Sequence, residues 1–153
     1  MYYFKIAINK IYWICYIKGE RCVSSSEPLL VKAIENKKTA ELALKKQYYN
    51  SATNRIYYSL FQMTLHVLSK KGITVEEKRS DDDKRNTHER TIDTLINQAL
   101  TTKEEKVEVA KFHVIRKMRN RADYQTQLIN KDLYDFTIAP SVESVERVLR
   151  KHS

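Results

Sequence analysis

Between residues 29 and 135 the chain carries almost nothing that would break a helix. The whole sequence holds two glycines and two prolines, and of these only Gly72 lies inside this stretch. Lys, Glu, Leu, Ala, Gln and Arg dominate the same residues, and all six favour helix. The sequence therefore predicts an all-α fold, an antiparallel up-and-down bundle of four to five helices.

The 153 residues are the length of one ordinary domain. We expect residues 26–153 to form this helical domain and residues 1–25 to form a short extra N-terminal segment. The apolar run at residues 11–17 is far shorter than the ~20 residues of a membrane span, and no signal-peptide cleavage pattern follows it. The segment suits a short strand or packing element, or a translated leader without a role in the fold.

The net charge is strongly positive, at +9 with an isoelectric point of about 9.5. Such an excess attracts polyanions and favours nucleic acid or an acidic protein as the partner, and simple solubility is the plainer alternative. Cys15 and Cys22 have no nearby pair of histidines and do not form a zinc site. Two cysteines fit a reduced cytoplasm. The prediction is a cytoplasmic protein without a metal, a cofactor or a membrane partner.

Apolar residues at helical spacing define five expected helices, at residues 28–47, 49–71, 87–100, 103–127 and 142–151. Ser26 is expected to cap the first, Gly72 to stop the second and Thr87 to cap the third. Residues 73–86 and 129–141 are expected to be connections. Outside the fourth helix, the expected inward residues are Leu30, Ala33, Ile34, Ala40 and Leu44, then Ala52, Ile56, Leu60, Met63 and Val67, then Ile92, Leu95, Ile96 and Leu100, and finally Val142, Val145 and Leu149.

The fourth helix contains the most informative pattern. At ~100° per residue, one arc is apolar and is expected to face the core, and the opposite side carries a polar stripe. The stripe is either an ordinary solvent-exposed helix face with an Arg119–Asp123 ion pair or a surface for phosphate contact and base stacking. The apolar arc contains Val107, Ala110, Val114, Ile115, Met118 and Ala122, and the stripe contains His113, Arg116, Arg119, Asn120, Asp123 and Tyr124.

Three stretches resemble one known family when they are taken together. They are YNSATNRIYYSLFQMTLHVL (residues 49–68), THERTIDTL (87–95) and MRNRADYQ (118–125). In this order they are similar to the small prokaryotic branch of the HEPN family, over about residues 28–152. The resemblance implies a homodimer in which two motif helices line one basic cleft. It also implies a metal-independent ribonuclease, often a toxin neutralised by a nucleotidyltransferase antitoxin, or an antiviral defence protein.

The family motif places an Arg, a polar residue and, after a spacer, a His on this helix. By resemblance Arg119 is the motif Arg, which would stabilise charge growing on the phosphate, and Asn120 is the polar residue. Tyr124 stands where the motif has its His, and a phenol titrating near 10 is a poor base at neutral pH. It can still donate a hydrogen bond or stack on a base. The expected catalytic residues are Arg119, Asn120 and Tyr124.

Six further residues are expected to bind RNA or a nucleotide. Asn54 and Arg55 match the Asn-Arg of the family, and they serve either the site or a polar clamp between helices. His88 matches a Thr-His pair of the family and could replace the missing base, or it is a locally bonded residue at a helix start. His113 is a second candidate base, across a dimer. Tyr57 and Tyr58 suit packing better than base stacking. The motif helix adds Arg116, Arg121 and Asp123.

Two functions remain open from the sequence. The first is an RNA-binding ribonuclease, the toxin component of a toxin–antitoxin or antiviral defence system, that cleaves at a dimer cleft without metal. The alternative is a non-catalytic nucleotide- or RNA-binding partner subunit of a minimal nucleotidyltransferase, in which Tyr124 could accept a nucleotidyl group. A helical scaffold without a ligand is a third, plainer reading. The expected partners are a second copy of the chain, RNA and a nucleotidyltransferase antitoxin.

Overall fold

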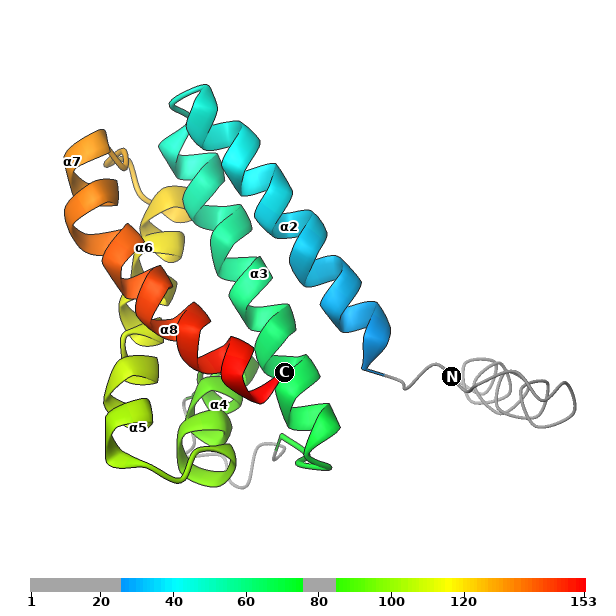
Figure 1. The fold of residues 1–153 in the computed structure, drawn as a ribbon. Coiled ribbons are helices and arrows are strands. Elements are labelled where there is room, and N and C mark those ends of the chain that lie inside the picture. Colours follow the sequence, from blue (N-terminus) through cyan, green and yellow to red (C-terminus); the bar gives the residue numbers. More distant parts are fainter. Residues whose placement is uncertain (1–25, 76–84) are drawn as a thin grey trace, which may run out of the picture.

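A computed structural model of the chain describes residues 26–75 and 85–153, and every regular element in these two ranges is helical. Helix α2 (Glu27–Lys45) runs antiparallel to α3 (Tyr49–Lys70), the longest helix, which lies at the centre of the fold (Figure 1). The chain then runs up and down again, so the predicted bundle is confirmed. The N-terminal segment expected at residues 1–25 lies outside the described residues.

Seven shorter elements complete the bundle within the described residues. A helix formed by α4 (Thr87–Thr94) and the π-helical η1 (Leu95–Ala99) lies at the lower end of α3 (Figure 1). The chain returns upward through α5 (Lys103–Ala110) and α6 (Phe112–Tyr124). It descends through α7 (Lys131–Leu133), η2 (Tyr134–Ile138) and α8 (Ala139–His152). No helix in the described parts of the chain is long and apolar enough to cross a membrane.

The core forms around α3, which packs against α2, α6 and α8. Burial of this apolar surface supplies the main drive for folding, since helices of this length are marginal alone. Most expected inward residues are buried or pack against the core. Among the residues expected to face inward outside the fourth helix, Ile34 is the exception, with 46% of its surface exposed on the outer side of α2. The largest fully buried side chains include Tyr57, Phe112, Leu68, Ile92, Leu95, Ile115, Ile138 and Leu149.

The helix ends correct two expectations and confirm a third. Gly72 stops α3 with φ 68, and the Ile73 amide bonds to the Leu68 carbonyl at 2.9 Å, as in a Schellman motif. Thr87 was expected to cap the next helix, but Asn86 does so. Its side chain accepts from the Glu89 amide at 3.0 Å, and the Glu89 carboxylate accepts from the Asn86 amide at 3.1 Å, which forms a capping box. Ser26 makes no side-chain cap.

The expected fourth helix is two helices, because the chain leaves helical register at Lys111. The Val114 amide bonds back only three residues, to the Lys111 carbonyl at 3.0 Å. This break turns the apolar faces of α5 and α6 relative to each other, so Val107 and Val114 are 60% and 37% exposed, contrary to the expected core arc. Ala110 is also exposed, and the buried residues at this junction are instead Val109 and Phe112. The helix ends at Tyr124, three residues earlier than expected.

The stretch at residues 129–141 was expected to be a connection, and most of it is helical. Asn130 caps it, its side chain accepting from the Leu133 amide at 2.9 Å, and helical backbone continues from there into α8. Ile138 is fully buried and Tyr134 nearly so. The aromatic and apolar residues of this stretch therefore belong to the core.

Glu105 joins three helices at the lower end of the bundle. It is buried on α5, where Lys151 donates to its Oε1 at 2.6 Å and His152 Nε2 lies 3.2 Å from its Oε2. His152 Nδ1 in turn lies 3.1 Å from Lys71 Nζ at the end of α3. The hydrogen bond from Lys151 lowers the pKa of Glu105, burial opposes the shift and His152 adds to it.

Candidate nucleic-acid interface

Arg119 is firmly anchored between two helices. Its Nη2 donates a 2.6 Å hydrogen bond to the hydroxyl of Tyr58 on α3. Its Nη1 donates to Asn120 Oδ1 at 3.1 Å, and its Nε lies 3.0 Å from Asp123 Oδ2. Only 15% of the side chain is exposed. These contacts fix the guanidinium of Arg119 in one orientation, so Arg119 is not a freely solvated residue on a solvent-exposed helix face.

Three tyrosine rings surround this guanidinium. Arg119 Cζ lies 5.8, 5.3 and 5.4 Å from the ring centroids of Tyr57, Tyr58 and Tyr124, within cation–π range. Burial disfavours the charge, but Tyr58, Asp123 and Tyr124 together outweigh it and raise the pKa of Arg119 above its ordinary value. The cluster thus fixes a permanent positive charge beside aromatic faces.

Asn54 and Arg55 extend the cluster along α3. Asn54 Nδ2 donates to Asp123 Oδ1 at 2.5 Å, which makes Asn54 a polar clamp between α3 and α6. Arg55 donates at 3.3 Å to the side-chain oxygens of Asn54 and Asn36, and its Cζ lies 5.6 Å from the Tyr58 ring centroid. Both acceptors are neutral amides, and no described carboxylate pairs with Arg55. Its exposed charge is available to an anion.

His88 enters the same cluster from α4. Its Nδ1 lies 2.8 Å from the buried Tyr57 hydroxyl, and its ring centroid lies 4.3 Å from that of Phe61. Burial lowers the pKa of His88, and the charges of Arg119 and Arg116 lower it further. Burial also raises the pKa of Tyr57 to about 12, so its phenol stays protonated. His88 is therefore neutral at neutral pH, the form in which an imidazole can accept a proton.

Arg116 and His113 are paired with acids of α4. Arg116 Nη2 forms an ion pair with Oε1 of Glu89, the residue after His88, so its charge is already balanced. His113 Nε2 lies 3.4 Å from Asp93, which also binds Arg85 at 3.3 Å. His113 therefore belongs to a separate charge cluster and does not supply a base to the tyrosine cluster within one chain.

Tyr124 is the most exposed predicted catalytic residue, with 75% of its surface open to solvent. Its hydroxyl has no hydrogen-bond partner among the described residues, and one side of its ring faces the Arg119 guanidinium. A flat ring backed by a cation and otherwise open to solvent is a suitable platform for a nucleobase.

The structure brings together eight of the nine residues that the sequence singled out. Arg121 is separate, because two residues beyond Arg119 a helix has turned by ~200°. The side chain of Arg121 forms no hydrogen bond or ion pair with another described residue. The eight that meet are Asn54, Arg55, His88, Arg116, Arg119, Asn120, Asp123 and Tyr124.

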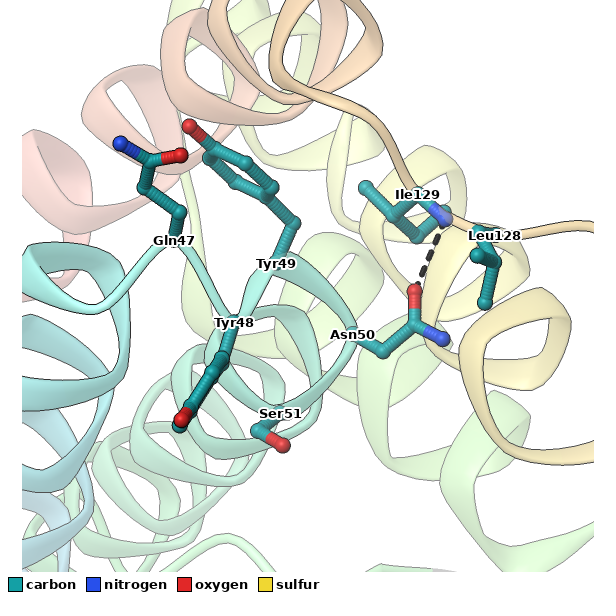
Figure 2. Close-up of a pocket in the computed structure, with 7 residues that line it drawn as sticks. All are labelled: Gln47, Tyr48, Tyr49, Asn50, Ser51, Leu128 and Ile129. Atoms are coloured by element: carbon teal, nitrogen blue, oxygen red, sulfur yellow. Dashed lines mark hydrogen bonds between the residues drawn. The ribbon is translucent and has the colours of Figure 1, made fainter.

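A shallow cavity of about 300 Å³ lies at the start of α3, one helical turn before Asn54 and Arg55. Figure 2 shows its two sides, with Tyr48 and Ser51 on one and Leu128 and Ile129 on the other. The Asn50 side chain closes the gap by accepting from the Ile129 amide at 2.8 Å (Figure 2). The loop after α6 is thereby pinned to α3, which keeps the end of α6 and Tyr124 beside the cluster.

Tyr58 is the residue that the sequence reading undervalued. It was expected to pack, yet its hydroxyl orients Arg119, and its ring contacts both Arg119 and Arg55. The sequence spacing could have indicated this role, because Tyr58 is four residues after Asn54 and therefore lies on the same helix face. The packing prediction is correct for Tyr57, which is buried.

No group of three or more His, Cys, Asp or Glu that could hold a metal ion occurs within residues 26–75 and 85–153. Comparisons with protein-family models, with curated proteins and with solved structures found no match for this chain. The resemblance to the HEPN family accordingly rests on the sequence motifs alone.

Proposed function

We propose that this chain is a HEPN-type RNA-binding protein that cleaves RNA without a metal at a dimer cleft, as the toxin component of a toxin–antitoxin or antiviral defence system. The observation that carries the proposal is the single cluster that joins Arg119, His88 and the tyrosines from three helices. It combines a neutral imidazole that can move a proton and a fixed guanidinium that can stabilise charge on a phosphate. An open aromatic ring beside them can stack on a base.

In this proposal His88 takes the role of the missing motif histidine. Its neutral imidazole removes the proton from the attacking 2′-hydroxyl, and Arg119 stabilises the charge that grows on the phosphate oxygens. The attack forms a 2′,3′-cyclic phosphate, and the leaving 5′ oxygen takes up a proton. Tyr124 stacks on a neighbouring base, and Arg55 contacts a flanking phosphate.

The proposal is tested with purified full-length protein and single-stranded RNA in excess chelator. We expect cleavage to cyclic-phosphate ends by the wild type, and its loss in Arg119→Ala and His88→Asn. Arg119→Lys should fail too, because a lysine keeps the charge but not the planar fork that bonds two partners. Arg147→Ala, which removes an exposed cation of α8, is the matched control. Intact RNA with a folded wild type would contradict the catalytic proposal.

A second function is favoured by the exposure of Tyr124. A free phenol at the site suits a non-catalytic subunit that presents a nucleotide or RNA to a nucleotidyltransferase, or that is itself modified on this hydroxyl. RNA binding without cleavage would favour this reading. A mass increment on Tyr124 after incubation with a nucleotidyltransferase and ATP, absent from Tyr124→Phe, would support it further.

A further inference from the structure

An apolar groove lies at the end of the bundle opposite to Tyr124. It has a volume of about 380 Å³ and forms where the start of α2 diverges from the lower half of α3 (Figure 1). Its walls come from α2, the end of α3 and the residues after Gly72. The lining residues are Leu29, Leu65, Leu68, Ser69, Gly72, Ile73, Thr74 and Val75.

The mostly apolar lining of the groove favours an apolar occupant over a charged one. No charged side chain lines it, and Leu29, Leu65, Ile73 and Val75 are each only partly buried. A cavity of ~150 Å³ lined by such residues accepts one benzene ring, so this groove has room for about two large apolar side chains. Apolar surface of this kind is stabilised when another apolar segment covers it.

The chain itself supplies such a segment close by. The described structure begins at Ser26, three residues before Leu29 in the groove wall. Residues 11–17, IYWICYI, are all apolar or aromatic. The eight residues between them and Ser26 span up to ~26 Å when extended, which is ample for a return to the groove. Residues 76–84 follow Val75 of the groove wall in the sequence, but eight of these nine are charged, so they do not suit the apolar lining.

We propose that residues 11–17 fold back onto the bundle and fill the groove between α2 and α3 of the same chain. The segment would then complete the core at this end and anchor the first turn of α2, which has no side-chain cap. This inference is independent of RNA binding, because the groove lies along the last turns of α3 and shares no lining residue with the Arg119 cluster.

Trp13 offers a direct test, because it is the only tryptophan in the chain. In the full-length protein we expect its emission at shorter wavelength than that of free tryptophan, with weak quenching by acrylamide. Leu65→Glu and Ile73→Glu, in the groove wall, should shift the emission to longer wavelength and increase quenching. Val31→Glu, on the outer side of α2, is the matched control and should do neither.

Three results of this experiment would overturn the proposal. The first is a solvent-exposed Trp13 in the folded wild type, and the second is a buried Trp13 whose emission the groove variants leave unchanged. A blue shift that disappears on dilution would also contradict it, since it would show that a second copy supplies the segment. Far-UV circular dichroism of each variant separates loss of docking from loss of fold.

A cross-link gives a second readout that does not depend on the groove variants. Cys15 and Cys22 are the only cysteines, so Cys22→Ser with Thr74→Cys leaves one thiol in the segment and one in the groove wall. Mild oxidation should form an intramolecular disulfide, detected by peptide mapping. A control with the new cysteine at Val31 should stay reduced. Equal cross-linking at both positions would overturn the proposal.

Discussion

Replacing Tyr58 with phenylalanine removes the one hydroxyl that holds Arg119 against α3, and keeps the ring that the guanidinium contacts. The lost hydrogen bond is 2.6 Å long and has a charged donor with 15% of its side chain exposed. Hydrogen bonds to charged groups contribute about 1.5–3 kcal/mol. Because water can reach part of the guanidinium, we expect the lower half of this range, about 1.5–2 kcal/mol, a roughly tenfold to thirtyfold change in the unfolding equilibrium.

Urea denaturation measures this change as a lower midpoint with an unaltered slope. Tyr124→Phe is the matched control, because its hydroxyl has no partner among the described residues and its ring is mostly in solvent. We expect the control to change the free energy of unfolding by less than ~0.5 kcal/mol. If Tyr58→Phe were as neutral as Tyr124→Phe, the hydroxyl would not anchor Arg119, and the account of a fixed guanidinium would be wrong.

Four further outcomes follow from the structure. Asn86→Ala removes the capping box of α4 and should destabilise the protein by about 1 kcal/mol in urea denaturation. Phe112→Ala empties a fully buried site and should cost about 3–5 kcal/mol in the same assay. The pKa of Glu105 is lower in the folded protein than in the unfolded chain. The ionised carboxylate therefore contributes its full stabilisation above about pH 4.3, and this stabilisation is lost as the pH falls through the pKa of the folded protein. Glu105→Gln should therefore make the free energy of unfolding fall less steeply in acid. By NMR, His88 should titrate below about pH 6.5 because of burial and Arg119, and Arg119→Ala should raise its midpoint.

Helical spacing predicted the bundle because each helix buries one face against the core. The apolar residues of that face repeat within the helix's own sequence, whichever helix packs against it. Helical spacing failed at Lys111, where the chain changes register without a glycine or a proline. At this junction Val109 and Phe112 are fully buried, while Val107 and Val114 of the expected apolar arc are exposed. Residues 129–141 were missed because an uneven π-helical turn blurs the period of 3.6 residues.

For the candidate site, too, one part could be predicted from the sequence and another part could not. Helical spacing placed the polar residues of α6 on one stripe, and the resemblance to the HEPN family added Asn54, Arg55 and His88. The sequence did not indicate which of them pair with each other. That Arg116 binds Glu89, that Asn54 rather than Arg55 holds Asp123, and that Tyr58 orients Arg119 depend on contacts between helices far apart in sequence.

The salt dependence of single-stranded RNA binding tests most directly whether the guanidinium groups around Tyr58 contact RNA phosphates. Each phosphate contact to a single strand contributes about −0.7 to the slope of log K against log salt concentration. Arg55→Ala should make the slope shallower by about this amount, and Arg147→Ala on α8 should leave it unchanged. No binding at low salt, or a slope that Arg55→Ala and Arg147→Ala alter equally, would contradict the account.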